Sequence, residues 1–439
     1  MKKLIALLLA LVMVVGLVAC GAKEEAAAPA ATEAAPAATE AAPAAPEAAD
    51  EPIELTMLSW RTEDLEILNK IGEQFTAQNP NIKVNFDIPT SDNAQYYNIL
   101  KTRMSSDNSK VDILAIHAGS ETAEMAGANK LLEITDSDLV KLVTPDLMES
   151  EKTADGKIYG VPQTFQAYVI YYNKAIFAEC GLEAPKTWDE LMNVCKVLRD
   201  NGHQTIAAGF AEAWTLDLLN NPIFTSYNKD NLKIQLQLQN GEASFTDENV
   251  KRVFEDVQAY GKNGVFIDGV QGTSYDASIA LFAQEAAAML CTGSWDIGPV
   301  KNQNPDIEIG FFVLPNSEDY CPMTTALGQS YAINANSPNT EAAMKFLEFM
   351  YSPEIAGQYA EATSQFSATA GVSIDNADLN AVMELLATHD SFPGPNEYPT
   401  KTEVYDIIRE ALARSLNGEN LDTVLSDAEA RMTALREEG

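Results

Sequence analysis

The sequence predicts an α/β protein made of two doubly wound units with a cleft between them, and three observations lead there. Strands and helices alternate through residues 53–116, as in a parallel sheet with helices on both faces. The same alternation restarts after residue 174. Each half carries a tryptophan just after a predicted strand, Trp60 in the first and Trp295 in the second. Ligands of such sheets bind beyond the carboxyl ends of strands, so two such edges favour a ligand-binding cleft.

The first half opens on residues 53–60, whose alternation of apolar and polar residues is typical of a strand. Thr62 is the expected N-cap of a helix that ends at Asn79-Pro80-Asn81. Further elements are expected over 82–88 (strand), about 93–105 (helix) and 111–116 (strand). The ends of these strands are expected to place six residues on one edge of the sheet: Trp60, Arg61, His117, Gly119, Ser120 and Glu121.

The stretch from Gly160 to Lys174 separates the two halves. Pro162 cannot donate to a sheet ladder and fits an edge strand or a crossing segment, whereas residues 168–172 are apolar and aromatic, as in a buried strand. The stretch by itself fits either a loop–strand junction in one domain or a crossing between two. Because the α/β pattern restarts behind it, we expect a crossing, with the polar Gln166 at the seam.

In the second half, Thr187 and Glu190 form a capping box for a helix over 188–201. A short strand from Ile206 leads to Trp214, and a buried strand over 286–291 leads to Trp295. Residues 307–315 form a strand closed by a proline. Ser337-Pro338 and Ser352-Pro353 each pair an N-cap serine with a proline at the first helical position, which predicts two helix starts.

The first 52 residues predict targeting and a stalk rather than a folded unit. Residues 1–20 combine two lysines with a short apolar run, the pattern of a signal peptide, and the end of this segment resembles the lipobox of bacterial lipoproteins with Cys20 as the lipidated residue. An ordinary secretory signal with an incidental cysteine is the alternative. Residues 21–52 form a low-complexity Ala/Pro/Glu linker, too poor in large apolar residues to build a core.

Charge and motifs narrow the function class. The net charge of −35 argues against binding nucleic acid, because an acidic surface repels phosphates, and it suits a neutral or cationic partner. The chain has three histidines and no HExxH metal motif. The segment Gly328–Ala332 imitates a nucleophile elbow but lacks its second glycine. A glycoside hydrolase with paired catalytic carboxyl groups remains an alternative, because acidic residues are abundant in this chain.

Cysteine use is low beyond residue 20. The four remaining cysteines form no CxxC pair, so two disulfides and four buried thiols are both compatible with the sequence. These residues are Cys180, Cys195, Cys291 and Cys321.

From about residue 53 to the end, the chain resembles the extracellular sugar-binding proteins of ABC importers, the family that includes the maltose-binding protein. The similarity lies in short segments taken together and in order, behind a lipoprotein-like signal. They are Val111-Asp-Ile-Leu114, Gly156–Pro162 followed by Ile170–Lys174, Pro185–Leu191, Gly293-Ser-Trp295, Val313-Leu-Pro315 and Ala332–Pro338.

The resemblance implies two α/β lobes of the type II periplasmic-binding-protein kind, joined by three crossings near Gln163–Gln166, Leu314–Asn316 and Ser364–Ser367. Lobe 1 would comprise residues 53–165 and 315–365, and lobe 2 residues 166–314 and 366–439. It further implies a monomer, anchored by lipid on the outer face of the bacterial membrane, that closes on a carbohydrate, most simply an oligosaccharide, and hands it to a permease. Neither a cofactor, a metal nor a chemical step on the sugar is expected.

The resemblance also implies ligand-contacting residues. Family members place aromatic residues at the positions of Trp214 and Trp295, where they stack on sugar rings. Gln166 and Glu212 match carboxylates that accept sugar hydroxyls, and an amide at Gln166 should alter selectivity. Trp60 could equally cover the core of lobe 1. Further candidates are Arg61, His117, Ser120, Gln329 and Tyr405, and an alternative ligand for the same fold is a polyamine or another small cation.

Overall fold

The computed structural model describes residues 52–90, 93–105, 109–398 and 400–438. The expected signal peptide, the lipidated Cys20 and all but the last residue of the expected linker lie outside these ranges. Within the described part, two β-sheets each carry their own hydrophobic core. The protein is therefore α/β, as the sequence predicts.

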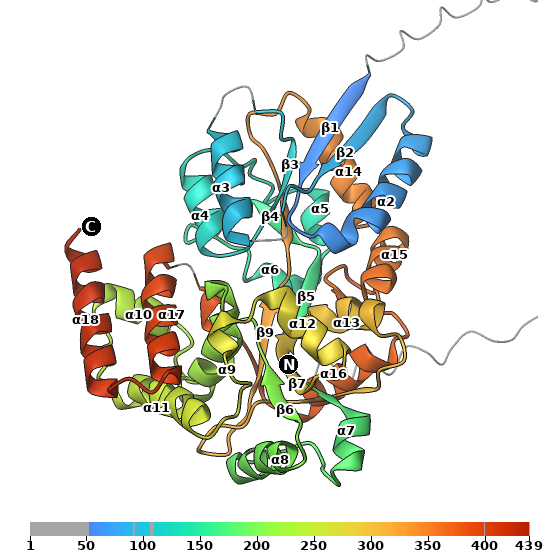
Figure 1. Cartoon of the computed structure of the whole chain (residues 1–439). Helices are drawn as coiled ribbons and strands as arrows, with labels where there is room; N and C mark the ends of the chain where they lie inside the picture. Colours follow the sequence, from blue (N-terminus) through green and yellow to red (C-terminus); the bar gives the residue numbers. More distant parts are fainter. Residues whose placement is uncertain (1–51, 91–92, 106–108, 399, 439) are drawn as a thin grey trace, which may run out of the picture. The chain divides into compact units, whose positions relative to one another are not determined.

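The first sheet has five strands in the order β2-β1-β3-β10-β4. Strand β1 runs parallel to both β2 and β3, whereas β10 is antiparallel to β3 and β4. Figure 1 shows α2 on one side of this sheet and α3 and α4 on the other, which is the doubly wound arrangement. The strands are β1 (Ile53–Leu58), β2 (Ile82–Asp87), β3 (Ile113–Ile116), β4 (Gly160–Pro162) and β10 (Ser330–Ile333).

Helix α2 (Leu65–Gln78) shows how the first core forms, because its apolar residues at helical spacing are buried, Leu68, Ile71 and Phe75 among them. Thr62 is not the N-cap of this helix. It begins a 3-10 turn, η1 (Thr62–Asp64), that precedes α2. The other helices packed around the first core are α3 (Asn93–Met104), α4 (Ser120–Gly127), α5 (Asp138–Lys141), α6 (Pro145–Met148), α14 (Thr340–Met350) and α15 (Pro353–Thr363).

The second sheet is organised around β5 (Thr164–Asn173), which pairs antiparallel with four other strands. The remaining pairs, β6 with β7 and β12 with β9, are parallel. The further strands are β6 (Gln204–Ala207), β7 (Ala287–Gly293), β8 (Ile309–Phe312), β9 (Met323–Leu327), β11 (Phe366–Ser367) and β12 (Ser391–Pro393).

The predicted capping box is present at the start of α8 (Trp188–Asp200), where Thr187 and Glu190 exchange hydrogen bonds with each other's backbone. The C-terminal helices α17 (Thr402–Leu416) and α18 (Leu421–Glu437) pack beside α11 (Glu248–Lys262) (Figure 1). Other elements with the second core are α7 (Lys174–Glu179), η2 (Ala213–Leu216), α9 (Asp217–Tyr227), α10 (Ile234–Asn240), η3 (Val270–Gly272), α12 (Tyr275–Ala283), η4 (Ser294–Asp296), α13 (Ile297–Gln303), α16 (Ala377–Thr388) and η5 (Pro395–Glu397).

The stretch from Gly160 to Lys174 does cross between the sheets. Strand β4 is the edge of the first sheet and β5 belongs to the second, so only Gln163 separates them. Pro162 lies in that edge strand, where a residue without an N–H is tolerated. Backbone bonds tie this crossing to two others, from Gln163 N to Gln329 O at 2.9 Å and from Ala368 N to Gln163 O at 3.1 Å.

The second crossing lies later than the expected Leu314–Asn316. Strand β9 pairs with β5, from Phe165 opposite Leu327 to Tyr168 opposite Thr324, so the chain stays with the second sheet as far as residue 327. Tyr260 holds the earlier segment in place, because its hydroxyl donates to the Pro315 carbonyl at 2.7 Å. By strand pairing the chain therefore returns to the first sheet through Gly328 and Gln329. The third crossing, Ser364–Ser367, leads into β11, which pairs with β5.

Of the two predicted helix starts, one holds. Pro353 is the first residue of α15 after Ser352, whereas α14 begins only at Thr340 with Asn339 as its N-cap. All four described cysteines are free thiols, Cys195 and Cys291 buried and Cys180 and Cys321 partly so. No helix in the described ranges is both long and apolar enough to cross a bilayer.

Candidate ligand-binding cleft

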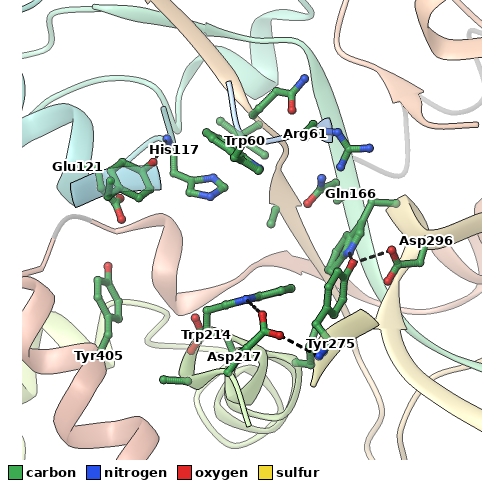
Figure 2. A pocket seen from close by; sticks show the side chains of 18 of the residues that line it. Trp60, Arg61, His117, Glu121, Gln166, Trp214, Asp217, Tyr275, Asp296 and Tyr405 are labelled. Atoms are coloured by element: carbon green, nitrogen blue, oxygen red, sulfur yellow. Dashed lines mark hydrogen bonds between the residues drawn. The ribbon is translucent and has the colours of Figure 1, made fainter. Parts of the chain in front are cut away.

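A cavity of about 860 Å³ opens between the two sheets and takes its walls from both. In Figure 2, Trp60 and His117 lie above it, Trp214 and Tyr405 below it, and Gln166 beside it. All ten residues proposed from the sequence as ligand contacts line this cavity: Trp60, Arg61, His117, Ser120, Gln166, Glu212, Trp214, Trp295, Gln329 and Tyr405.

The wall of the first sheet presents a group of aromatic rings. Trp60 follows β1, and its ring lies 4.7 Å from the His117 ring and 5.1 Å from Tyr96, centroid to centroid. Trp60 is 8% exposed and also belongs to the first hydrophobic core. Core packing and cavity lining are thus both roles of this side chain. The Tyr97 hydroxyl accepts a hydrogen bond from the His117 backbone N–H at 2.9 Å and fixes the turn after β3.

His117 is held uncharged by its surroundings. Burial lowers the pKa of the imidazole from 6.5 to about 4. Two smaller effects oppose each other, since Asp217 raises this pKa and Arg409 lowers it. At neutral pH the ring is therefore a neutral, flat surface beside Trp60. Such a surface suits the C–H face of a ring-shaped neutral ligand.

Arg61 reaches the cavity from the start of η1 and is already paired. Its Nε donates to Asp64 at 2.7 Å, and Nη2 lies 3.3 Å from the second Asp64 oxygen and 3.2 Å from Glu63. Burial opposes the charge, but the two carboxylates outweigh it, so the pKa of Arg61 lies well above its ordinary value. The guanidinium is a permanently charged donor whose charge the protein itself neutralises.

The wall of the second sheet is built around Trp295, which is 8% exposed. Its ring lies directly over Gly293, where an added Cβ would come within 1.9 Å of a ring carbon. The indole Nε1 donates to the Tyr275 hydroxyl at 2.9 Å, and that hydroxyl donates to Asp296 at 2.6 Å. This chain of bonds fixes the ring plane of Trp295 at the cavity.

Trp214 is positioned in a similar way. Its Nε1 donates to Glu212 at 3.2 Å, while the other Glu212 oxygen accepts from the Tyr275 backbone N–H at 3.0 Å (Figure 2). The Trp214 and Tyr275 rings meet edge to face at 4.9 Å. Glu212 lines the cavity, yet each of its oxygens already accepts a donor from the protein. The hydrogen bond from Trp214 makes Glu212 an orienting partner of that ring.

Gln166 and Gln329 lie where the chain crosses between the sheets. Gln166 on β5 is half-buried, whereas Gln329 is 2% exposed and donates to Tyr359 at 2.7 Å and Tyr331 at 2.9 Å. Gly328 lets the crossings approach, because a Cβ there would meet the Thr164 hydroxyl at 1.9 Å and the Gln166 amide nitrogen at 3.1 Å. The cavity-lining Gln166 thus lies close to the crossing at Gly328.

The side of the cavity near Tyr405 brings α4 and α17 together. The Ser120 hydroxyl on α4 donates to Glu121 at 3.2 Å, and the Tyr405 hydroxyl on α17 donates to the Tyr398 carbonyl at 3.4 Å. On the same helix as Tyr405, Arg409 pairs with Asp217, Nε to carboxylate oxygen at 3.0 Å. Polar side chains from distant parts of the sequence therefore meet at this side.

Several carboxyl groups of the cavity are held in a low-dielectric setting. Burial raises the pKa of Asp296 to about 7 and that of Glu397 to about 8, and in the second case Glu151 and Glu121 add repulsion. Burial also raises the pKa of Glu121. Groups of this kind exchange hydrogen bonds readily with hydroxyl or ammonium groups of a ligand.

The lining residues that were not proposed from the sequence as ligand contacts include Tyr275, Asp217, Asp296, Glu397 and Arg409. Tyr275 starts a helix after the N-cap Ser274, and Arg409 lies in an amphipathic helix, so local sequence gives no signal for either. Only Asp296, directly after Trp295, had a neighbour that marked it. No three His, Cys, Asp or Glu side chains gather as metal ligands in the part of the chain that the structure describes.

The protein has two α/β units whose sheets are joined by three crossings, and an aromatic and polar cavity lies between them. This architecture is typical of a solute-binding protein. Residues 59–357, more than half of the chain, match the family of bacterial extracellular solute-binding proteins. The chain belongs to this family.

Relatives and solved structures agree with this assignment. The multiple sugar-binding protein of Streptococcus mutans is 25% identical over 347 residues, covering 77% of this chain and 81% of that protein. A melibiose/raffinose/stachyose-binding protein of Bacillus subtilis is 24% identical over 335 residues, covering 73% of this chain and 75% of that protein. The structure of the solute-binding protein RafE with raffinose superimposes with a TM-score of 0.75 at 25% identity, covering 88% of this chain and all of that one.

Proposed function

We propose that this protein captures an uncharged oligosaccharide in the cleft and delivers it to the permease of an ABC importer, without chemistry on the sugar. The observation that carries the proposal is the cavity of about 860 Å³ lined by the rings of Trp60, Trp214, Tyr275 and Trp295. Flat rings suit the C–H faces of sugars, and the interleaved amides and carboxylates suit their hydroxyls. The names of the relatives point to the same ligand class.

The charges of the cavity favour a neutral ligand over an anionic one. Among the described lining residues the cations are Arg61, Lys101 and Arg409, and each is paired, with Asp64, Glu124 and Asp217 respectively. A uronic acid or sugar phosphate would find no unpaired cation among the described residues of these walls. We therefore expect neutral oligosaccharides to bind and their acidic analogues to fail.

The test is a binding panel with the purified protein. Raffinose, stachyose, melibiose, chitin oligosaccharides and maltooligosaccharides are titrated by calorimetry, with tryptophan fluorescence as a second signal. A ligand present at about 100 times its Kd raises the free energy of unfolding by about 2.7 kcal/mol, so a rise in Tm should accompany binding. If the sugars cause no heat and no shift while a polyamine panel does, the carbohydrate proposal is wrong.

A polyamine or other small cation is the second candidate, and one observation favours it. Glu121, Glu212, Asp296 and Glu397 all line the cavity. A cationic ligand that forms ion pairs with carboxyl groups of this set should bind much more weakly as salt rises from about 0.05 to 0.5 M, since screening acts on ion pairs. A neutral sugar should be nearly insensitive to the same change.

We further propose that the two sheets are the centres of two lobes that close on the ligand by a hinge movement. From strand pairing, lobe 1 comprises residues 53–163 and 328–365, and lobe 2 residues 164–327 and 371–438. Residues 366–370 lie between them as the end of the third crossing, because Phe366 pairs with β5 and Thr369 forms a bridge with Val143. The revised boundary keeps β9 with its partner β5. Small-angle scattering with and without a bound sugar tests the movement, because closure reduces the radius of gyration.

For the location we propose a monomer tethered by lipid on Cys20 at the outer face of the bacterial membrane. The family is extracellular, and the lipobox-like end of the signal segment supplies the attachment. Metabolic labelling with a fatty acid tests the anchor: the unsubstituted protein should take up label and Cys20→Ser should not. Size-exclusion chromatography of the released protein tests the monomer.

A further inference from the structure

A group of buried polar side chains lies behind the cavity wall, between Arg61 and the crossings. Asp64 is its centre: it is 1% exposed and is not part of the cavity lining. Its carboxylate takes the Arg61 guanidinium as a fork, with Nε at 2.7 Å on one oxygen and Nη2 at 3.3 Å on the other. Bidentate pairs of this kind fix the plane of a guanidinium as well as its position.

The same carboxylate is also bound from the crossing side. The Tyr359 hydroxyl on α15 donates to the oxygen that Arg61 Nε contacts. Gln329 Nε2 donates to the Tyr359 hydroxyl at 2.7 Å, and the Gln329 backbone oxygen accepts from the Gln163 N–H at 2.9 Å. Hydrogen bonds thus run without a break from a cavity-lining arginine to two of the three crossings.

From this connectivity we propose that Asp64 is a positioning residue for ligand binding, which sets the orientation of Arg61 at the cavity according to the arrangement of the crossings. The inference rests on the proposed function of the cleft and adds to it a coupling between ligand contact and hinge. Asp64 itself touches no ligand. It acts through Arg61 on one side and through Tyr359 and Gln329 on the other.

Burial makes such a coupling effective. Arg61, Asp64, Gln329 and Tyr359 are each at most 8% exposed, so a lost bond is not replaced by solvent. A change in the Gln329 crossing must therefore be met by a change in the donors around Asp64. The Gln329 side-chain oxygen has no hydrogen-bond partner among the described residues, which leaves this amide free to exchange partners when the crossing moves.

The first test is a double-variant cycle on the full-length protein, with raffinose and stachyose as probes in calorimetry. Asp64→Asn keeps the shape of the side chain but removes its charge, and we expect a loss of affinity of about tenfold. Arg61→Gln should lose at least as much. Because Asp64 acts through Arg61, the variant with both changes should bind no more weakly than Arg61→Gln alone. Losses that multiply in the double variant overturn the proposal.

The second test needs no ligand, so it judges the coupling even if neither sugar binds and the proposed function fails. Hydrogen exchange of residues 160–168 and 325–332 reports the crossings directly. Asp64→Asn and Tyr359→Phe should both speed exchange there, and Tyr359→Phe removes one hydroxyl without changing any charge. If a variant folds and its hydrogen exchange in these two ranges is the same as in the unsubstituted protein, the proposal is wrong.

Asp112→Asn is the matched control for both tests. Asp112 is also a buried carboxylate of the first core, 4% exposed, and it accepts bonds from Thr56 and Ser337 rather than from the crossings. Its substitution should lower the Tm yet leave sugar affinity and crossing exchange as they are. A loss of affinity in this control equal to that of Asp64→Asn would show general damage and would also overturn the proposal.

Discussion

Trp295 and Tyr275 are joined by a hydrogen bond of 2.9 Å from indole to phenol, and the phenol is joined in turn to Asp296 at 2.6 Å. The Trp295 ring is thus oriented by the hydroxyl of a second cavity-lining residue. Tyr275→Phe removes only this hydroxyl, so the Trp295 indole N–H loses its acceptor and the Asp296 carboxyl group loses a donor. We expect about 1–3 kcal/mol less stability and a severalfold weaker sugar affinity, measured by calorimetry.

A loss of stability without any loss of affinity would mean that Trp295 keeps its orientation by packing alone. The edge-to-face contact of Trp295 with Tyr168, at 5.5 Å, is the packing that would then suffice. The hydrogen bond would in that case serve the fold rather than the cleft.

Gly293 provides the space for the same ring. A methyl group at this position would lie 1.9 Å from a ring carbon of Trp295, so Gly293→Ala must displace the indole or the strand. Overpacking of this kind costs about 1–3 kcal/mol, and the displaced ring should bind sugar at least tenfold more weakly. Gly272→Ala is the control, because nothing lies within 4 Å of its added methyl, and its affinity should be unchanged.

Glu397 should make stability depend on pH near neutrality. Burial raises its pKa from 4.5 to about 8, so the folded state holds a proton that the unfolded state has lost. The associated stability is complete below about pH 4.5 and is lost as the pH rises through 8. Asp296, with a pKa raised to about 7, acts in the same direction.

The measurement is the Tm at pH 6.5 and pH 8. The unsubstituted protein should melt lower at pH 8, and Glu397→Gln should reduce this difference. The exposed Glu361→Gln serves as control and should leave the difference as it is. An equal drop in Tm for Glu397→Gln and the unsubstituted protein would contradict the prediction.

His117 should act in the opposite direction and at lower pH. Its pKa is lowered from 6.5 to about 4, so the unfolded state takes up the proton first and stability falls as the pH drops from 6.5 towards 4. His117→Phe keeps a ring beside Trp60 but cannot be protonated, so its Tm should fall less between pH 6.5 and pH 4.5. His203→Phe, outside the cavity lining, should keep the full drop.

Local patterns predicted much of this fold because they act over a few residues. The alternation of residues 53–58 gives β1, and the reciprocal bonds of Thr187 and Glu190 need only three residues of spacing. The tryptophans after strands were informative for the same reason, since the end of a strand is a local signal. This signal alone predicted Trp60 and Trp295 as candidate residues of the cleft.

Pairings over long sequence distances were not predictable in this way. Residues 323–327 could have joined either sheet, and only their ladder with β5, about 160 residues earlier, decides it. Arg409 reaches the cavity because it pairs with Asp217, 192 residues away. Tyr275 matters through its bonds to Trp295 and Asp296, which no spacing rule indicates. The cleft was thus predictable where strand ends define it and not where distant helices complete it.

Gln166 remains the most informative single position for the ligand. It lies on β5 beside the first crossing, half-buried, with its amide nitrogen near Gly328, and it lines the cavity. Gln166→Ala removes an amide that can both donate to and accept from sugar hydroxyls, so we expect about a tenfold loss of affinity. The Tm of the ligand-free protein should change by less than about 2 °C, because the half-buried side chain contributes little to either core.

Gln74→Ala on α2 is the control for this prediction and should leave affinity unchanged. The Gln74 amide donates to Gln358 at 2.9 Å, and Gln74 is not part of the cavity lining. A large fall in Tm with unchanged affinity would instead show that Gln166 stabilises the crossing. The ligand would then be bound by the other side chains that line the cavity.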